Sequence, residues 1–189
     1  MLIAFHKPYG VLSQFTPDAP GQRTLAEFGF PPRVYAVGRL DLDSEGLLIL
    51  SDEPGLNHRL LDPKNAHWRR YYAQVEGIPS DDQLRLLQAG VKIADWKTLP
   101  ARAWLLPEEP PFPPREPPIR VRPTIPTRWI ALELREGKNR QVRRMTAAVG
   151  LPTLRLVRVA IGDYHLPADL SSGQWRPLEE DGRAQLFGR

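Results

Sequence analysis

The chain contains no cysteine among its 189 residues. Disulfide bonds and metal sites built on thiolates are therefore excluded. It also lacks any apolar run near the roughly 20 residues that span a membrane, and Met1 to Lys7 lack the apolar stretch of a signal peptide. Its four histidines are scattered without the spacing of metal ligands. From these absences we expect a cytosolic protein without a bound metal.

Positive charge, in contrast, is present in excess. The formal net charge is +4 and the sequence pI is about 9.6. Seven lysines and arginines lie between Arg135 and Arg158, with Glu136 as the one acid among them. Such a cluster of cations is typical of a protein that binds nucleic acid. A solvated basic helix face accounts for the same residues equally well.

The pattern of apolar residues predicts an α+β protein in which strands and helices are interleaved. Thr24 and Ser80 are typical helix caps, and Gly29 and Gly90 end the helices that follow them. The predicted strands are residues 2–5, 11–15, 34–37, 47–51, 71–75, 99–106, 128–136 and 154–161, and the predicted helices are 24–28, 55–61, 81–88 and 139–149.

Nine prolines crowd the twenty residues from Pro107 to Pro126. Proline lacks the backbone N–H and fixes φ, so this segment forms neither a helix nor a central strand. We expect either a stiff exposed loop or a clamp laid across the surface. Arg115, Arg120 and Arg122 offer contacts to RNA, but we favour a passive loop.

A polar loop joins two predicted strands between Gly38 and Gly46. Three acids, Asp41, Asp43 and Glu45, lie within five residues, and Arg39 precedes them. A carboxylate beside a fixed cation stays ionised and keeps one direction, as a reactive carboxylate must. A solvated acidic turn is the alternative, and spacing alone does not identify which acid acts.

Five blocks of the sequence, in order, resemble the signature of the pseudouridine synthase family that includes ribosomal small subunit pseudouridine synthase A. The most specific is Gly38-Arg39-Leu40-Asp41 with the apolar run that ends at Leu50. The other four are His6 to Gly10, Arg69 to Gly77 (in which Arg69 replaces the usual lysine), Glu136 to Met145, and Leu156 to Gly162. The resemblance covers nearly the whole chain.

The resemblance implies the pseudouridine synthase fold, an α+β fold with a mainly antiparallel mixed sheet flanked by helices. We expect two approximate lobes, residues 1–66 and 67–189, with a central cleft. The chain 1–189 is then a single catalytic domain, without the small amino-terminal RNA-binding domain that family members often carry. The implied activity is site-specific isomerisation of uridine to pseudouridine in large-subunit (23S) ribosomal RNA, by a monomer that needs no cofactor.

Three residues match catalytic positions of the family. Asp41 matches the catalytic carboxylate, which acts as a nucleophile or as a base, and the sequence leaves both roles open. Tyr71 matches the active-site aromatic, whose ring stacks on the base and whose hydroxyl can handle the C5 proton. Arg143 matches the cation that pairs with the catalytic carboxylate. Without the family, Tyr71 fits a core residue and Arg143 fits a phosphate contact.

Six further residues are expected to bind the substrate. Arg39 matches the family arginine that contacts the RNA backbone or fills the gap left by the extruded base. Leu156 matches the apolar residue that packs against that base. Extrusion is needed because a carboxylate cannot reach the reacting atoms inside a stacked helix. The remaining RNA contacts that we expect are Arg69, Lys138, Arg140 and Arg144.

Two other functions fit parts of the sequence. A non-catalytic RNA-binding or ribosome-assembly factor with the same fold would tolerate loss of Asp41, Tyr71 or Arg143, yet all three are present. A glycoside hydrolase would need paired carboxylates, and only one acid here has a matched role. Pseudouridine in RNA that has been incubated with the pure protein would separate the three functions.

Overall fold

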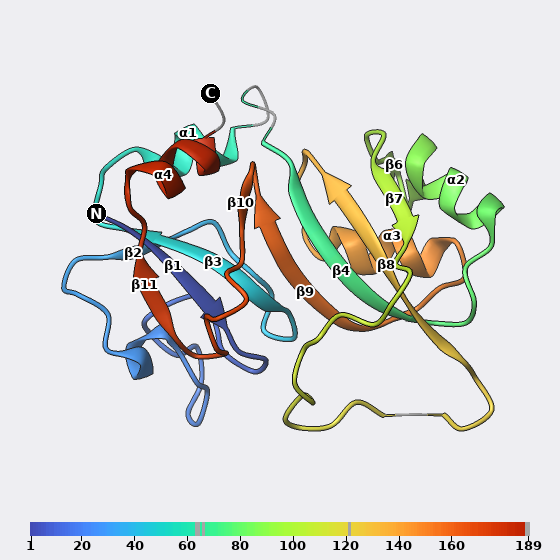
Figure 1. Ribbon diagram of the computed structural model, residues 1–189, viewed down its shortest axis with the longest axis horizontal. Coiled ribbons are helices and arrows are strands. Elements are labelled where there is room, and N and C mark those ends of the chain that lie inside the picture. The colour runs from blue at the N-terminus through green and yellow to red at the C-terminus, as the bar shows by residue number, and fades with distance from the viewer. Residues whose placement is uncertain (63–64, 66, 121, 188–189) are drawn as a thin grey trace. The chain divides into compact units, whose positions relative to one another are not determined.

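The computed structural model describes residues 1–62, 65, 67–120 and 122–187. The chain divides into two compact units (Figure 1). The first is Met1–Arg69 together with Val157–Arg189, and the second is Arg70–Leu156. This division differs from the expected lobes, 1–66 and 67–189, because the chain after Leu156 returns to the first unit.

The first unit is built on a mixed sheet. Its strands are β1 (Leu2–Lys7), β2 (Tyr35–Val37), β3 (Glu45–Ser51), the last residues of β9 (Thr153–Ile161), β10 (Tyr164–His165) and β11 (Trp175–Pro177). Their order is β11-β1-β3-β9, with β2 beside β3 and β10 beside β9. The pairs are antiparallel except β3–β9, which is parallel. Every residue of β1 and β3 is buried, so both faces of these strands are covered.

Side chains of the same unit cover this sheet. Leucines of α1 (Leu56–Leu61) and α4 (Glu180–Phe187) join an apolar cluster with one face of β1 and β3. On the other face, Phe5 contacts Phe28, the last residue of the 3-10 helix η1 (Leu25–Phe28), with ring centroids 4.8 Å apart. The strand β3, which leads out of the Asp41 loop, is thus fixed in the core, and Val37 at the end of β2 joins the same apolar cluster.

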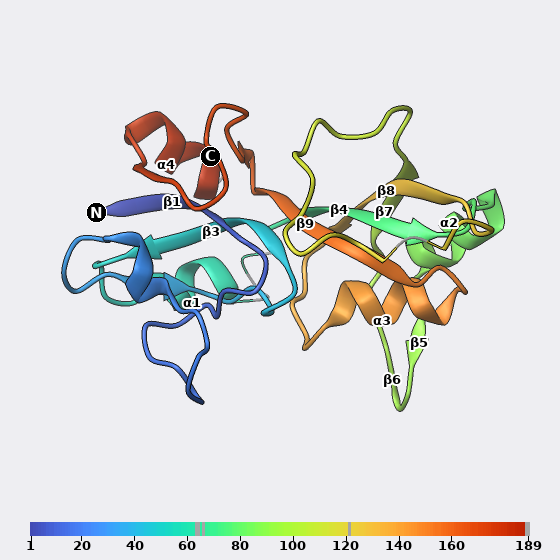
Figure 2. The same cartoon turned by 90° about the horizontal axis from the view of Figure 1, so that it is seen from below.

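In the second unit the strand order is β9-β4-β8-β7. The elements are β4 (Arg69–Glu76), β7 (Arg102–Leu105), β8 (Thr127–Leu134), the first residues of β9, the hairpin β5–β6 (Lys92–Ile93 and Trp96–Lys97), α2 (Asp81–Ala89) and α3 (Gln141–Ala148). Both helices and the hairpin contribute to one apolar cluster with the strands. Figure 2 shows the hairpin extending on the same side of this sheet as α3.

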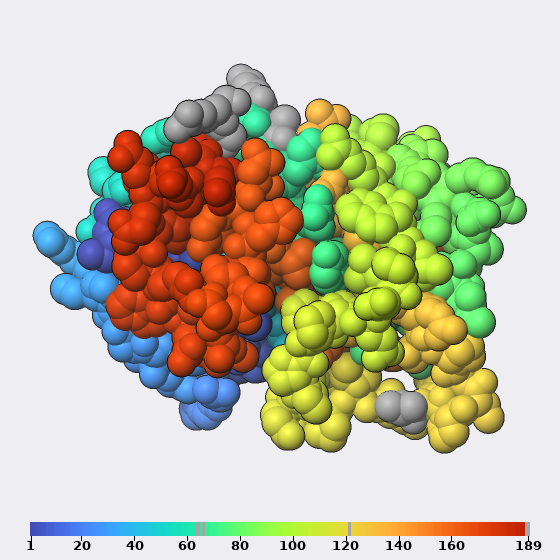
Figure 3. Space-filling view, in the orientation of Figure 1, coloured from blue at the N-terminus to red at the C-terminus, as the bar shows by residue number. Residues whose placement is uncertain are grey.

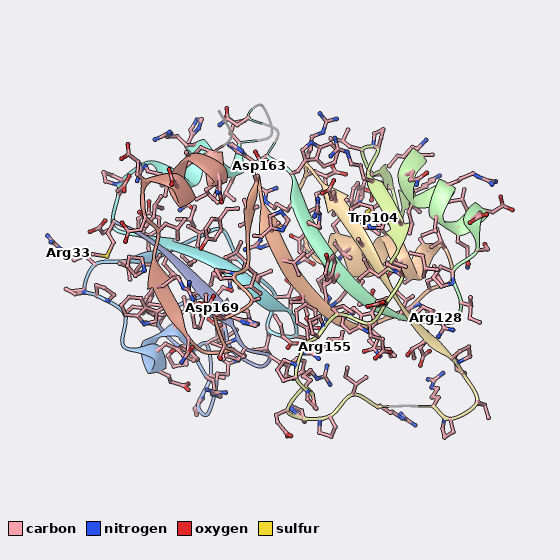
Figure 4. All side chains as sticks on the ribbon, in the orientation of Figure 1. Arg33, Trp104, Arg128, Arg155, Asp163 and Asp169 are labelled. Carbon is pink, nitrogen blue, oxygen red and sulfur yellow. The ribbon has the colours of Figure 1, made fainter. Side chains whose placement is uncertain are left out.

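Charged and aromatic side chains line the strands β4, β7 and β8 outside that cluster. The Glu133 carboxylate pairs with Arg70 at 2.6 Å and with Arg102 at 3.0 Å. The guanidinium of Arg70 also lies over the ring of Trp104, which Figure 4 labels on β7, 5.4 Å from its centroid. These pairs join three neighbouring strands through their side chains.

The helix starts and ends follow local sequence signals. The hydroxyls of Thr24 and Ser80 accept backbone N–H groups at the starts of η1 and α2, in capping boxes completed by Glu27 and Gln83. Gly29 follows η1 in the left-handed conformation. The predicted caps at Thr24 and Ser80 are confirmed.

The α+β class with a mixed, mostly antiparallel sheet is confirmed, but one predicted strand is wrong. Residues 11–15 make a single bridge, between Val11 and Arg23, and no strand. The hairpin β5–β6, the strands β10 and β11, and α4 have no counterpart in the prediction. Strands of two or three residues contain too few positions to show an alternating pattern.

The proline-rich segment contains no helix or strand in the described residues of 107–126, from which residue 121 is left out. Its Phe112 packs against Trp129, with ring centroids 5.8 Å apart. The guanidinium of Arg155 lies over the Phe112 ring and donates to the Pro113 carbonyl, 2.9 Å away. Most of the segment is exposed on the surface of the second unit (Figure 3). It therefore combines both expected forms, a clamp at Phe112 and an exposed loop.

Candidate active site

The loop that carries Asp41 is held by hydrogen bonds to the segment after β1. The Ser13 hydroxyl donates to the Leu40 carbonyl at 2.7 Å and accepts the Leu40 N–H at 3.0 Å. The Asp41 carbonyl accepts the Ser44 N–H at 3.0 Å, which closes a turn. Leu40 and Ser44 are buried, and Asp41 between them is half-buried. The carboxylate therefore extends from a backbone that is fixed on both sides, as a reactive group requires.

Two buried cations flank β3 directly after this loop. In the register of the sheet, Gly46 lies opposite Lys7 on one side and Arg158 on the other. A Cβ at Gly46 would lie 2.3 Å from the Arg158 carbonyl oxygen, and φ at Gly46 is +102°, so the close approach requires glycine. The Lys7 ammonium donates to the carbonyls of Val11 at 2.6 Å and Pro8 at 2.9 Å. The cation thus also closes the turn that follows β1.

Burial is the main influence on the pKa of Lys7. Loss of solvent lowers the pKa of Lys7 to about 7, while the carboxylates of Glu45, Asp43 and Asp41 act in the opposite direction. Arg158, as a second positive charge, adds to the lowering of this pKa. The three loop acids therefore lie close enough to the buried Lys7 to act on its charge.

Arg39 lies on the same loop and is exposed. Its Nη2 donates to Oε1 of Gln14, 3.0 Å away. The exposure makes the side chain accessible to a large substrate, while the hydrogen bond restrains its direction.

In the second unit, Tyr71 lies on the same face of β4 as Ala73 and Val75, because side chains alternate along a strand. Ala73 and Val75 are fully buried, whereas Tyr71 is half-buried and packs against a cluster that includes Leu156. An aromatic ring held by packing and open in part to solvent can present its face to a base. The structure thus places two candidate base contacts, Tyr71 and Leu156, in one cluster.

Arg143 and Arg144 follow each other on α3 and have different surroundings. Arg143 is half-buried, and its Nη1 donates to the Thr153 carbonyl at 3.3 Å. Arg144 is exposed, and its Nη2 donates to Oδ1 of Asn139 at 3.4 Å. Successive helix residues point about 100° apart, which accounts for the difference. Arg143 is therefore suited to orient a carboxylate, and Arg144 is suited to meet a phosphate.

Gln141 organises the loop before α3. Its side chain accepts the Lys138 N–H at 3.0 Å and donates to the Glu136 carboxylate at 2.7 Å. Arg140 adopts the left-handed conformation, with φ of 52°, directly before the helix begins. The Lys138 ammonium lies 3.9 Å from the centroid of the Trp96 ring. This cation–π contact, which the sequence does not predict, holds Lys138 against the hairpin β5–β6.

Arg69 differs from its expected role as an RNA contact. Only 6% of the residue is exposed, and its Nη2 donates to the Leu60 carbonyl at 3.1 Å. A buried, hydrogen-bonded guanidinium would have to leave these contacts to reach a phosphate, and that is costly. The structure therefore argues against direct RNA binding by Arg69.

The candidate residues are divided between the two units. Arg39, Asp41 and Arg69 belong to the first, and the second contains Tyr71, Lys138, Arg140, Arg143, Arg144 and Leu156. Lys7 and Arg158 have no role in the sequence prediction, although both lie in matched blocks. The sequence does contain a feature that could have identified Lys7 and Arg158. Each is a charged residue in a nearly apolar strand, and buried lysine and arginine are rare.

Within the described ranges, no group of three or more His, Asp or Glu side chains could hold a metal ion. Among the helices in the part of the chain that the structure covers, none has the length and apolar character needed to cross a membrane.

Comparison of the chain with known proteins points to one family. The family model described as RNA pseudouridylate synthase matches residues 1–148. The chain is 58% identical over 169 residues to ribosomal large subunit pseudouridine synthase E of Xanthomonas axonopodis pv. citri (strain 306), with 89% of each chain covered. It is 31% identical to ribosomal small subunit pseudouridine synthase A of Escherichia coli (strain K12), over 96% of this chain and 71% of the relative.

The structure is also similar to solved structures. A crystal structure of a pseudouridylate synthase matches with a TM-score of 0.80 at 24% sequence identity, over 98% of this chain and 73% of that chain. This likeness shows the same fold. Because the family model covers most of the chain and close relatives match along its length, the chain belongs to the RNA pseudouridylate synthase family.

Proposed function

We propose that this chain isomerises a uridine to pseudouridine in large-subunit ribosomal RNA, with Asp41 as the catalytic carboxylate. The observation that carries the proposal is the half-buried Asp41 on a fixed turn, within electrostatic reach of the buried Lys7, in a chain of this family. The relative named as a large-subunit enzyme is 58% identical, whereas the relative named as a small-subunit enzyme is 31% identical. The difference in identity favours large-subunit RNA.

The reaction breaks the N1–C1′ bond of uridine, turns the base, and joins C5 to C1′. C5 loses a proton and N1 gains one, so the product is an isomer and no oxidant or energy donor is needed. In the proposed mechanism Asp41 acts as a nucleophile or a base in this exchange. Lys7 acts electrostatically on the loop that carries Asp41, and the family match assigns Arg143 the role of orienting the carboxylate. Tyr71 stacks on the uracil ring, and its hydroxyl assists removal of the C5 proton.

The target base must leave its stack before these groups can reach it. In the proposed complex, Leu156 packs against the extruded base, and Arg39 contacts the RNA backbone or fills the gap. Arg140 and Arg144 contact phosphates at the start of α3, and Lys138 adds its charge from its position on Trp96. The net charge of +4 supports this partner.

The proposed partner is 23S ribosomal RNA or its large-subunit precursor. We propose that the chain acts as a monomer in the cytoplasm, where this RNA is made and assembled. Size-exclusion chromatography with light scattering checks the monomer, which a mass near twice 21.5 kDa would refute.

The test of the function is tritium release from transcripts labelled at C5 of uridine, with transcripts of 23S RNA compared with transcripts of small-subunit RNA. The wild-type protein should release tritium from the 23S transcripts. Asp41→Asn should reduce the rate at least about 100-fold while RNA binding persists. Tritium release from small-subunit RNA only would refute the substrate.

Asp43→Asn is the matched control, because it removes a carboxylate from the same loop, and it should retain most activity. Full activity in Asp41→Asn with loss in Asp43→Asn would transfer the catalytic role to Asp43. RNA binding by the wild-type protein without tritium release would identify a non-catalytic RNA-binding or ribosome-assembly factor.

A further inference from the structure

The side chain of Gln14 connects two loops of the first unit. Its Nε2 donates to the Thr16 carbonyl at 2.7 Å and to Oδ1 of Asp18 at 2.8 Å. A carbonyl and an ionised carboxylate only accept, so the amide nitrogen faces them and the amide oxygen points elsewhere. That oxygen accepts Nη2 of Arg39 at 3.0 Å. The direction of Arg39 is therefore coupled to the fold of the segment after β1.

The segment that holds Gln14 is ordered by further bonds that do not involve Arg39. The Leu25 N–H donates to the Gln14 carbonyl at 2.9 Å. Oε1 of Gln22 accepts the Asp18 N–H at 2.8 Å, which fixes the backbone beside one of the acceptors of the Gln14 amide. Both the backbone of Gln14 and its side chain are thus restrained, so the amide oxygen is a fixed acceptor for Arg39.

A neutral acceptor is the appropriate partner for an arginine that binds RNA. The guanidinium has five N–H donors, and the bond to Gln14 uses one of them. A carboxylate in this place would cancel part of the attraction between Arg39 and phosphate. An amide leaves the charge intact, and it restrains a long side chain whose freedom would otherwise be lost on binding.

We infer that Gln14 is a positioning residue that presets the guanidinium of Arg39 for the RNA substrate. The inference rests on the proposed function and deepens it, because Arg39 has a role there and Gln14 has none. Because Gln14 acts by holding Arg39, its effect on RNA binding should disappear when Arg39 is absent. A residue that only stabilised the loop would affect RNA binding whether or not Arg39 were present.

The test is a double-mutant cycle of Gln14→Ala and Arg39→Ala, measured on the Kd for large-subunit RNA and on kcat and KM for tritium release. In the wild-type background Gln14→Ala should raise Kd and KM about fivefold, which corresponds to one ordinary hydrogen bond. In the Arg39→Ala background the same change should have less than about a twofold effect. In neither background should kcat change, because the bond acts on binding.

Gln22→Ala is the matched control, because Gln22 supports the same segment without the bond to Arg39. It should leave Kd within about twofold of the wild-type value. Additive losses in the cycle, a fall in kcat alone, or an equal loss in Gln22→Ala would each overturn the inference. Absence of tritium release by the wild-type protein would instead refute the proposed function, and the cycle on Kd decides the role of Gln14 independently.

Discussion

Replacing Lys7 by methionine should change how stability depends on pH. Lys7 has no exposed surface, and its pKa falls from the usual 10.5 to about 7. Between these values the unfolded chain binds a proton on Lys7 that the folded chain has released. The free energy of unfolding of the wild-type protein therefore rises with pH across this window. Methionine has a similar length but no proton to bind, so Lys7→Met lacks this rise.

The magnitude follows from the two pKa values. A tenfold change in proton affinity corresponds to about 1.4 kcal/mol. The wild-type protein should therefore gain roughly 2 kcal/mol relative to Lys7→Met between pH 7 and pH 9, and almost nothing between pH 5 and pH 6. The lost hydrogen bonds to Val11 and Pro8 add an offset of similar size at every pH. The slope against pH, and not the offset, is therefore the diagnostic quantity.

The assay is urea unfolding of both proteins at pH 5, 6, 7, 8 and 9, with the free energy of unfolding extrapolated to water. Lys97→Met, which removes an exposed ammonium, serves as the control for substitution of a lysine. Parallel pH curves for the wild-type protein and Lys7→Met from pH 7 to pH 9 would refute the reasoning. They would mean that the buried ammonium keeps its proton in the folded state.

Three further predictions concern the two units. Gly46→Ala should lower the free energy of unfolding by more than about 3 kcal/mol, because the new Cβ meets the Arg158 carbonyl at 2.3 Å; a loss below about 1 kcal/mol in urea unfolding would contradict this. Arg183 holds the pKa of Glu53 at about 2, so Glu53→Gln should be less stable than wild type at pH 7. That difference should vanish as the pH falls from 4.5 towards 2, and a constant difference would reject the pairing. Arg143→Ala should lower the single-turnover rate of tritium release far more than RNA affinity, and a change in affinity alone would remove its proposed role.

The parts of the fold that depend on neighbouring residues could be predicted from the sequence. Thr24 and Ser80 cap their helices because a capping box needs only a residue three positions later. The strands β1 and β3 could be predicted for the same reason, since six and seven successive buried residues leave a clear apolar pattern. The order of the strands is not local, and the sequence did not predict it; the family resemblance implied only a mainly antiparallel mixed sheet.

Residues 11–15 show where local pattern fails. Their apolar and polar residues favour a strand, but a strand forms only where a partner edge is available. Here the Ser13 side chain forms a hydrogen bond with the Leu40 backbone, and the Gln14 side chain forms one with Arg39. The segment therefore has the composition of a strand, but its pairing is limited to the Val11–Arg23 bridge and a few backbone hydrogen bonds.

Charge in the sequence does not report exposure, and this limits the prediction of RNA contacts. Arg69 and Lys138 both lie in matched blocks and carry the charge expected of a phosphate contact. The structure buries Arg69 against the Leu60 carbonyl and stacks Lys138 on Trp96, which belongs to an unpredicted hairpin. Leu60 lies nine residues before Arg69, and Trp96 lies on the distant hairpin β5–β6, so neither contact can be read from the residues adjacent to the cation.

Polar residues inside buried strands carry more information about this site than the acidic loop does. Three acids within five residues leave the reactive one open, and any solvated turn can contain them. A lysine in a strand as apolar as β1 is different, because burial of an uncompensated charge is costly and an opposite charge must lie close by. Lys7 therefore predicts nearby acids, and the structure supplies Glu45, Asp43 and Asp41. Since all three act on the same ammonium, the buried charge locates the cluster, and tritium release by Asp41→Asn and Asp43→Asn assigns the reacting carboxylate within it.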